Sequence, residues 1–462
     1  MHIEQIYTNC LAEASYYIES NGEVAIIDPI RETEPYTSRA RERNAKIKYV
    51  FETHFHADFI SGHIDLANKT GAKIIFGPKA NTEYEIISAK DGQEFQLGNV
   101  KIKVLHTPGH TPESSSFLLI DSEGKNHAVF TGDTLFVGDV SRPDLLDGIM
   151  TKEELSGMLY DSLNSKIKPL ADDVIVYPGH GPGSSCGKNI GTETWSTIGI
   201  QRKTNYAMQD MTKEAFIAVV TDGLLPPPAY FFASAKINKQ GYQDIETVLE
   251  RNVKPLSVAE AKAKMDAGAI VVDTRNAEQF ANEFIPGSIN IGLDGSFALW
   301  VGAILDPKGQ FIVLAEEGRE KEAVLRMARV GYENIPGYLS GGIAAWKATG
   351  LNTGKIENIS ATDFYNLNKS EKLNVLDVRK VSEYSNCHLM DAKNIPLADL
   401  SKNLDKIDAN EKLYVHCAGG YRSMIAASLI WSSGKHDVVN IEGGFGRMKE
   451  TPIEIVKEWE TV

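Results

Sequence analysis

Short apolar runs that end abruptly in polar or turn-forming residues dominate the first half of the chain. Runs of this length, rich in valine and isoleucine, predict β-strands that deliver polar side chains to one rim. Residues 153–163 and 212–221 have the apolar spacing that is typical of helices instead. The strands that we expect are Val24–Ile27, Lys48–Phe51, Lys73–Phe76 and Val174–Tyr177. This half of the chain is therefore predicted to combine several strands with a few helices.

From residue 255 onward the pattern changes, and the new pattern occurs twice. Ser257 with Glu260 forms a capping box that opens a helix, and a buried-strand run follows at residues 270–275. The same order returns with Ser360 and the strand run at residues 375–379. Two copies of alternating helices and strands predict two α/β modules with parallel sheets. The predicted domains are residues 1–250, 251–355 and 356–462.

Length and charge limit the classes of partner. A chain of 462 residues is too long for one hydrophobic core and suggests about two to four domains. A net charge of -14 argues against nucleic acid or an anionic membrane as partner, because both need basic stripes. No apolar run reaches the length of a bilayer span, and no secretory signal is visible at the N-terminus. With only four cysteines, we expect reduced thiols and a cytoplasmic location.

Histidine and aspartate side chains gather where several predicted strands end. Each of these segments places metal-competent side chains directly behind an apolar run, and three of them also contain a glycine that lets the backbone turn. A single histidine of this kind is more often a surface or capping residue. Several segments that end alike favour a shared metal, because rigid ligands must converge from separate parts of a chain. The candidate ligands are His54, His56, Asp58, His110, Asp133 and His180.

These segments resemble the metallo-β-lactamase superfamily, whose signature is a His-x-His-x-Asp-His run followed by a separated His, Asp and His. The resemblance covers the first domain and implies an αββα sandwich with the metal at one edge of its two sheets. Phe59 stands where the last histidine of the run is expected, and His63 lies too far along the loop to replace it. Because phenylalanine binds no metal, the family's second metal position loses a ligand, which disfavours a two-zinc hydrolase.

The ligand set that the resemblance leaves is His54, His110 and Asp133. Two histidines and one carboxylate suit non-haem Fe(II) and leave open positions for O2 and substrate. We expect one Fe(II) per chain, with zinc as the alternative ion in purified protein. Weaker candidates, as ligands or as partners of the ligands, are His56, Asp58 and His180.

Within the superfamily, the chain is similar to persulfide dioxygenases, which include the mitochondrial enzyme lost in ethylmalonic encephalopathy. In that family the residue matching Arg142 binds the carboxylate of glutathione persulfide, a role that suits the arginine fork. The alternative for Arg142 is a surface ion pair. The tyrosine that follows the last histidine in glutathione-using relatives is replaced by Gly181-Pro182, so coenzyme A or another small thiol is an alternative carrier. The shared segments are Ala57-Asp58, Thr131–Phe136, Ser141–Asp144, Leu159-Tyr160 and Tyr177-Pro178.

Cys186 follows His180 closely and is expected near the metal. A nearby lysine, Lys188, would favour its thiolate. We consider a role in binding or relaying persulfide beside the alternative of a buried structural cysteine.

A second cysteine opens a glycine-bearing loop in the last module. Cys417 follows a predicted strand at residues 412–416, and a helix is predicted from Ser423 onward. Backbone N–H groups of the loop, the helix N-terminus and Arg422 would together stabilise a thiolate or a persulfide anion on the cysteine. The alternative is an ordinary buried cysteine at a strand end.

The cysteine loop resembles the active loop of the rhodanese family, and both modules carry that family's early Asp-x-Arg. In the middle module Ala315 occupies the place of the cysteine, and Glu316 and Glu317 would repel an anionic sulfur donor. The middle copy is therefore predicted to be catalytically silent, with a structural or docking role.

Three functions remain open at this point. We favour a persulfide dioxygenase fused to a sulfurtransferase, in which O2 oxidises a low-molecular-weight thiol persulfide to sulfite and Cys417 gives or uses thiosulfate, in sulfide detoxification. The second is a zinc thioester hydrolase of the glyoxalase II kind with rhodanese modules. The third is a sulfur-binding regulator whose rhodanese modules dock a partner. A homo-oligomer is compatible with each of them.

Overall fold

A computed structural model describes residues 1–462 except 146–148, 225–226, 229, 408–410 and 458–462. The chain divides into two compact units, one made of residues 1–247 with 329–331 and one of residues 248–328 with 332–462. The domain boundaries at residues 250 and 355 stay predictions. Among the described residues, no helix is long and apolar enough to cross a membrane.

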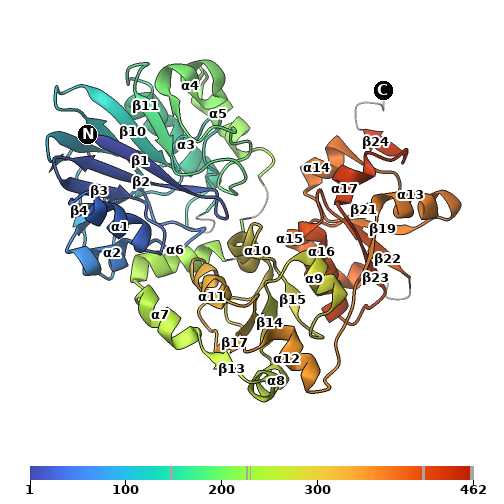
Figure 1. Ribbon diagram of the computed structural model, residues 1–462. Helices are drawn as coiled ribbons and strands as arrows, with labels where there is room; N and C mark the ends of the chain where they lie inside the picture. Colours follow the sequence, from blue (N-terminus) through green and yellow to red (C-terminus); the bar gives the residue numbers. More distant parts are fainter. Residues whose placement is uncertain (146–148, 225–226, 229, 408–410, 458–462) are drawn as a thin grey trace. The chain divides into compact units, whose positions relative to one another are not determined.

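The first unit contains two mixed sheets of six strands each (Figure 1). The first sheet has the order β1 (His2–Thr8), β2 (Glu13–Ser20), β3 (Glu23–Ile27), β4 (Lys46–Glu52), β5 (Lys73–Phe76) and β6 (Ile87–Ser88). The second has the order β12 (Ser196–Thr197), β11 (Ile175–Pro178), β10 (Asn126–Gly132), β9 (Ser115–Ile120), β8 (Val100–His106) and β7 (Glu94–Leu97). The four predicted strands correspond to β3, β4, β5 and β11, so these predictions are confirmed.

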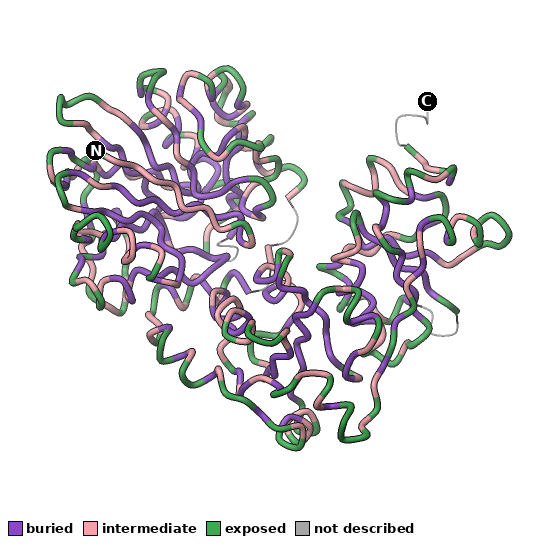
Figure 2. The backbone as a smooth tube through the Cα atoms, in the orientation of Figure 1, coloured by how far each residue is buried: buried purple, intermediate pink, exposed green. Residues whose placement is uncertain are grey.

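A continuous apolar core fills the space between the two sheets. Phe51 of the first sheet and Phe117 of the second are both fully buried, with ring centroids 4.8 Å apart. Along β8, buried and exposed positions alternate, as they do in a strand with one face on a core. Figure 2 shows most strands as buried, whereas the outer helices combine buried, intermediate and exposed residues. Burial of one face of each sheet therefore fixes the register of the strands.

Helices cover the outer faces of both sheets. The helices α1 (Glu34–Glu42) and α2 (His63–Thr70) contact β4 of the first sheet. A second core packs α3 (Lys152–Ser162), α4 (Ile198–Thr204) and α5 (Lys213–Thr221) on the second sheet. The αββα sandwich is confirmed, as are the helices predicted at residues 153–163 and 212–221. The unit also contains α6 (Phe231–Gln240), and α7 (Ile245–Asn252) follows it.

The second unit contains two five-stranded parallel sheets with the same strand order, as the repeat predicts. The first copy contains β13 (Pro255–Leu256), α8 (Val258–Asp266), β14 (Ile270–Asp273), α9 (Ala277–Asn282), β15 (Ile289–Asn290), α10 (Phe297–Ile304), β16 (Phe311–Leu314), α11 (Glu320–Ala328), β17 (Gly337–Leu339) and α12 (Gly342–Ala348). The second contains β18 (Glu357–Ile359), α13 (Ala361–Ser370), β19 (Asn374–Asp377), α14 (Val381–Asn386), β21 (Lys393–Asn394), α15 (Leu397–Leu400), β22 (Leu413–His416), α16 (Tyr421–Ser432), β23 (Val438–Ile441) and α17 (Gly444–Met448). A two-stranded ribbon of β20 (Cys387–Leu389) and β24 (Ile455–Lys457) completes it.

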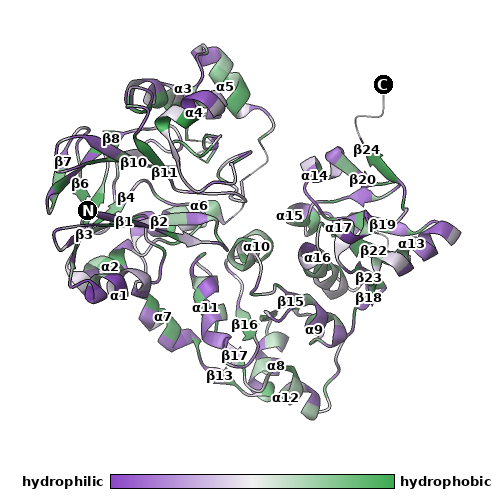
Figure 3. Ribbon diagram, turned by 45° about the horizontal axis from the view of Figure 1, so that its top comes forward, coloured by the Kyte–Doolittle hydropathy of each residue, from purple (hydrophilic) through white to green (hydrophobic). Residues whose placement is uncertain are grey.

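The helix starts that were predicted in the repeat have the expected chemistry. Ser257 and Glu260 form a reciprocal capping box at the start of α8, and the Ser360 hydroxyl accepts a hydrogen bond from the Asp363 N–H at the start of α13. Figure 3 shows the contrast between apolar strands such as β11 and hydrophilic helices such as α1.

Phe117 tests how far the sandwich core stabilises the first unit. We expect Phe117→Ala to lower the free energy of unfolding of this unit by about 3–5 kcal/mol, because it leaves a cavity between the sheets. Urea denaturation followed by circular dichroism measures this change. Phe232→Ala, at a position that is 50% exposed, is the control and should change it by less than about 0.5 kcal/mol. Equal effects of the two substitutions would contradict this account of the core.

Candidate metal centre and cysteine loop

Three strand ends bring the predicted ligands His54, His110 and Asp133 together. His54 follows β4, His110 lies in the loop after β8, and Asp133 directly follows β10. Asp133 Oδ2 lies 3.5 Å from His110 Nε2 and 4.0 Å from His54 Nε2, and all three side chains are buried. These ligand atoms lie within 4.8 Å of one another. The distances and the burial are those of a group that could hold one metal ion.

Each histidine of this group presents its Nε2 atom to the common point. His110 Nδ1 lies 3.2 Å from the Arg142 carbonyl oxygen, which can only accept a hydrogen bond, so Nδ1 carries the proton. The Thr53 hydroxyl donates to Asp28 and therefore accepts from His54 Nδ1 at 2.9 Å. Both Nε2 atoms are left with a free lone pair, as metal ligation requires. Burial, followed by the charges of neighbouring histidines, lowers the pKa of His54 well below its usual value, which keeps it neutral.

The buried carboxylate of Asp133 fits a bound cation. Neither of its oxygens has a hydrogen-bond partner among the described residues. A buried carboxylate in that state is costly unless a cation compensates it. The backbone at Gly132 lies very close to Thr53. Only glycine fits there, since a Cβ at Gly132 would lie 2.5 Å from Thr53 Oγ1. The donor set of two imidazoles and one carboxylate therefore suits a divalent ion.

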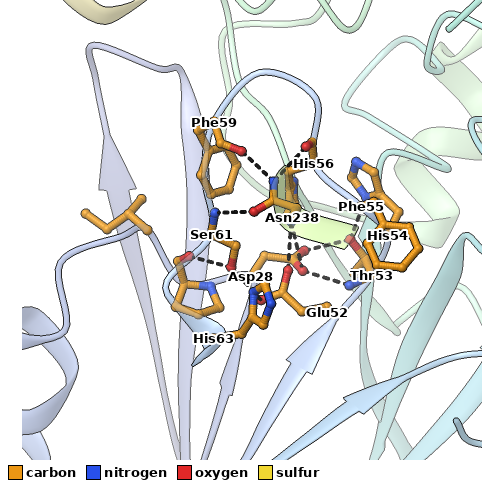
Figure 4. A network of polar contacts seen from close by, with 12 residues as sticks. Asp28, Glu52, Thr53, His54, Phe55, His56, Phe59, Ser61, His63 and Asn238 are labelled. Carbon is orange, nitrogen blue, oxygen red and sulfur yellow. Dashed lines mark hydrogen bonds and ion pairs between the residues drawn. The ribbon is translucent and has the colours of Figure 1, made fainter. Parts of the chain in front are cut away.

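His56 lies outside this group. Its Nε2 is 3.2 Å from Asp28 Oδ1 and 3.5 Å from Glu52 Oε2, within a buried network shown in Figure 4. Burial alone would lower the pKa of His56, but the nearby charges of Asp28 and Glu52 outweigh it and raise the pKa to about 9. Asp28 and Glu52 lie side by side because β3 and β4 are parallel, with Ile27 opposite Phe51. The structure thus separates His56 from the ligands to which it is closest in sequence.

Arg142 supports the site through its backbone and its side chain. Its carbonyl orients His110, its N–H donates to the Cys186 carbonyl, and its guanidinium forms two hydrogen bonds with Asp144 at 2.7 and 2.8 Å. The ion pair of the alternative is therefore present, with the Arg142 side chain only 7% exposed. Binding of a substrate carboxylate by Arg142 stays a prediction.

The cysteine loop lies at the end of β22, as predicted, and α16 follows it. The Gly420 N–H donates to Cys417 Sγ at 3.1 Å. Arg422 pairs with Glu383 at 2.6 and 2.9 Å, which fixes its guanidinium beside the loop. The sulfur atom of Cys417 thus lies next to a hydrogen-bond donor and the N-terminus of α16.

The middle copy has the same geometry without the sulfur. Ala315 follows β16, which has the place in its sheet that β22 has in the second copy. Asp273 holds Arg275, and Asp377 holds Arg379 in the same way. Alanine offers no nucleophile, and the catalytic silence of this copy stays a prediction.

The chain resembles known proteins in both of its parts. Residues 8–180 match the metallo-β-lactamase superfamily, and residues 257–349 and 360–451 match the rhodanese-like domain. A crystal structure of a metallo-β-lactamase from Staphylococcus aureus subsp. aureus COL is 32% identical and has a TM-score of 0.65. It covers 73% of this chain and 98% of that one. The chain belongs to the metallo-β-lactamase superfamily.

Relatives with two different activities resemble the metallo-β-lactamase domain to a similar degree. A cytoplasmic hydroxyacylglutathione hydrolase from Arabidopsis thaliana is 34% identical over 176 residues, which are 37% of this chain and 65% of that protein. The human mitochondrial persulfide dioxygenase is 27% identical over 208 residues, which are 45% of this chain and 74% of that protein. The chain thus spans slightly under two thirds of the hydrolase. The choice between the activities must come from the site itself.

The metallo-β-lactamase domain brings a second set of metal-competent side chains together. Asp58, His180 and Cys186 are buried, with ligand atoms within 4.8 Å of one another. His180 Nε2 lies 3.4 Å from Asp58 Oδ2 and 3.6 Å from Asp133 Oδ1. His180 Nδ1 is held by the Ala12 carbonyl at 3.0 Å. Phe59 stands where the family has a third ligand beside Asp58 and His180. The cysteine lies close to these two side chains instead.

The thiol of Cys186 is not activated by Lys188, so that expectation is wrong. Lys188 Nζ donates to the Val219 and Asp222 carbonyls instead. Burial, followed by the charges of Asp133 and Asp58, raises the pKa of Cys186 well above its usual value. The thiol form is therefore favoured unless a cation binds beside it.

Sequence reasoning missed three buried carboxylates near the metal centre. Asp28 and Glu52 bind His56, and Glu13 of β2 is buried with no hydrogen-bond partner for either oxygen among the described residues. Burial, then the charge of Asp28, raises the pKa of Glu13 well above its usual value. The signal that could have pointed to Asp28 and Glu52 is their place at the ends of predicted apolar runs, directly before Pro29 and Thr53.

Metal analysis of His110→Ala tests the ligand group. We expect this variant to lose most of the metal bound by the wild type after anaerobic reconstitution with Fe(II), because it removes one of three ligands. The control is His106→Ala, at a half-buried histidine of β8 whose Nε2 contacts the Pro112 carbonyl. Elemental analysis of both proteins, with circular dichroism to check the fold, gives the answer. Full metal content in His110→Ala would show that His110 is not a ligand.

Proposed function

We propose that the metallo-β-lactamase domain oxidises a thiol persulfide with O2 at a single non-haem Fe(II), and that Cys417 transfers sulfane sulfur. The overall reaction of the first step is R-S-SH + O2 + H2O → R-SH + SO3²⁻ + 2 H⁺, in which the terminal sulfur loses four electrons and O2 gains them. Sulfite then accepts a sulfane sulfur from a Cys417 persulfide and leaves as thiosulfate, or the transfer runs in reverse. This chemistry suits sulfide detoxification.

The observation that carries the proposal is the separation of His56 from His54, His110 and Asp133. Zinc hydrolases favour tetrahedral sites rich in histidine, whereas two histidines and one carboxylate with open positions suit iron that reacts with O2. When bound, Fe(II) supplies the redox chemistry with O2 that zinc lacks. The ligand residues hold the ion, and their burial excludes bulk water from it.

Residues of the second group and Arg142 would serve the substrate in this proposal. Cys186 lies beside Asp58 and His180, where its thiol form can contact a persulfide sulfur. Arg142 would bind the carboxylate of glutathione persulfide, or an acidic group of another small thiol, in exchange for Asp144. In the last module, the Gly420 N–H and the start of α16 stabilise the anionic sulfur on Cys417.

A zinc thioester hydrolase with rhodanese modules is the second candidate. Asp58, His180 and Cys186 favour it, because together with the first group they could hold two ions and bind the hydroxide between them. Cysteine is also a common zinc ligand.

An oxygen electrode distinguishes the two candidates. Protein reconstituted anaerobically with Fe(II) should consume O2 when glutathione persulfide or coenzyme A persulfide is added, and should form sulfite. The zinc-loaded protein is the control and should consume none, because zinc has no redox chemistry. Hydrolysis of S-lactoylglutathione by the zinc form, with no O2 uptake by the iron form, would contradict the proposal.

Cys417→Ser separates the two steps. We expect this variant to keep the O2 uptake of the wild type and to lose thiosulfate formation, because serine cannot carry a sulfane sulfur. Cys387→Ser, in β20 of the same module, is the matched control and should keep both activities. Thiosulfate formation that survives in Cys417→Ser would place the transfer site elsewhere.

A further inference from the structure

His56 is adjacent to the proposed metal centre but is turned away from it. The ring centroids of His54 and His56 are 4.3 Å apart. The Nε2 atom of His56 nevertheless points to the carboxylates of Asp28 and Glu52, at 3.2 and 3.5 Å. In the described part of the chain, the histidines with Nε2 within 4.0 Å of an Asp133 oxygen are His54, His110 and His180.

We infer that Glu52 and Asp28 are positioning residues that keep His56 out of the metal's ligand set. They thereby limit the centre to two histidines and one carboxylate. The inference rests on the metal centre of the proposed function and adds the residues that set its number of ligands.

Glu52 is held rigidly in the orientation that this role requires. Its Oε1 accepts a hydrogen bond from the Ser61 hydroxyl at 2.6 Å and lies 3.5 Å from His63 Nδ1. His63 is in turn held by the Tyr84 hydroxyl at 2.7 Å. With Oε1 occupied on one side, Oε2 is directed to His56 on the other.

Asp28 also binds Thr53, so a substitution of Asp28 would test the inference less specifically than a substitution of Glu52. Its oxygens accept hydrogen bonds from the Thr53 N–H at 2.7 Å and from the Thr53 hydroxyl at 2.8 Å. Because that hydroxyl orients His54, a substitution of Asp28 would disturb a proposed ligand directly. Glu52 has no such link to His54 among the hydrogen bonds of the described residues.

The backbone around His56 is clamped as well. Asn238 of α6 donates hydrogen bonds to the carbonyls of His56 and Phe59, both at 2.8 Å, and accepts one from the Ser61 N–H at 3.0 Å (Figure 4). The ring centroids of Phe59 and His56 are 4.4 Å apart. The residue that replaces a family ligand thus packs against the histidine that is turned away. Release of His56 therefore requires a side-chain rotation, and the Glu52 carboxylate opposes that rotation.

The number of histidine ligands decides the chemistry of such a centre. A third imidazole would occupy a position that O2 or the persulfide needs, and it would favour four-coordinate zinc. Glu52 thus acts as a determinant of metal choice without touching the metal or the substrate.

Cobalt substitution tests the inference by a double-mutant rescue. Co(II) absorbs more strongly in the visible range when its coordination number falls to four. We expect weak visible bands in the wild type and in His56→Ala, and stronger bands in Glu52→Ala, where Asp28 alone is left to hold His56 away from the metal. Glu52→Ala/His56→Ala should return to the weak bands of the wild type, which a purely structural effect of Glu52 would not explain. Elemental analysis after equal exposure to Fe(II) and Zn(II) should show a higher zinc share in Glu52→Ala alone.

Glu52→Gln keeps the side chain's size and its bond to Ser61, so it covers the case that the alanine variant folds poorly. It should shift the cobalt spectrum in the same direction by a smaller amount. Unchanged spectra in both Glu52 variants would overturn the inference while the proposed function stands. Cobalt loss in His56→Ala would show that His56 is a ligand and would overturn both. Failure of the wild type itself to bind cobalt or iron would overturn both.

Discussion

The carboxylate of Asp133 is buried at a point where it receives no hydrogen bond from the described residues, and the site around it depends on how that charge is neutralised. Its two oxygens face different partners, His54 and His110 on one side and His180 on the other. The histidines are oriented by carbonyl or hydroxyl oxygens that contact Nδ1, so that their Nε2 atoms point inward. A cation is the group that satisfies this arrangement, because a buried carboxylate is costly unless a positive charge compensates it.

The buried carboxylates of the sandwich have two separate roles. Asp133 faces the ligand histidines, whereas Asp28 and Glu52 hold His56 apart from them. This division follows from strand order, since Asp28 and Glu52 end the parallel neighbours β3 and β4 of one sheet, and Asp133 ends β10 of the other. The same principle operates in the last rhodanese-like module, where Cys417 follows the central strand β22 and its sulfur accepts a hydrogen bond from the Gly420 N–H just before α16. Both proposed centres thus use strand ends to place reactive groups.

Local sequence patterns predicted the secondary structure and pointed to the metal-competent side chains, whereas the family resemblance supplied the ligand set; both failed where distant segments meet. Val24–Ile27 and the Ser257 cap could be predicted because apolar runs and capping residues act over a few positions. The second group was predicted only in part: Cys186 was expected near the metal because it follows His180 closely, but its approach to Asp58 joins segments far apart in the sequence. The expectation that Lys188 faces Cys186 was wrong, because Lys188 binds the Val219 and Asp222 carbonyls. These carbonyls come from the end of α5 and the residue after it. The pairing of Glu52 with His56 depends on side-chain rotation, which no spacing reveals.

Anomalous diffraction from crystals of the protein reconstituted anaerobically with Fe(II) tests the central claim most directly. Data collected on both sides of the iron and zinc absorption edges should show one iron peak, bound by His54, His110 and Asp133, with His56 still directed to Glu52. Two peaks that share Asp133, with the second bound by Asp58, His180 and Cys186, would contradict the account.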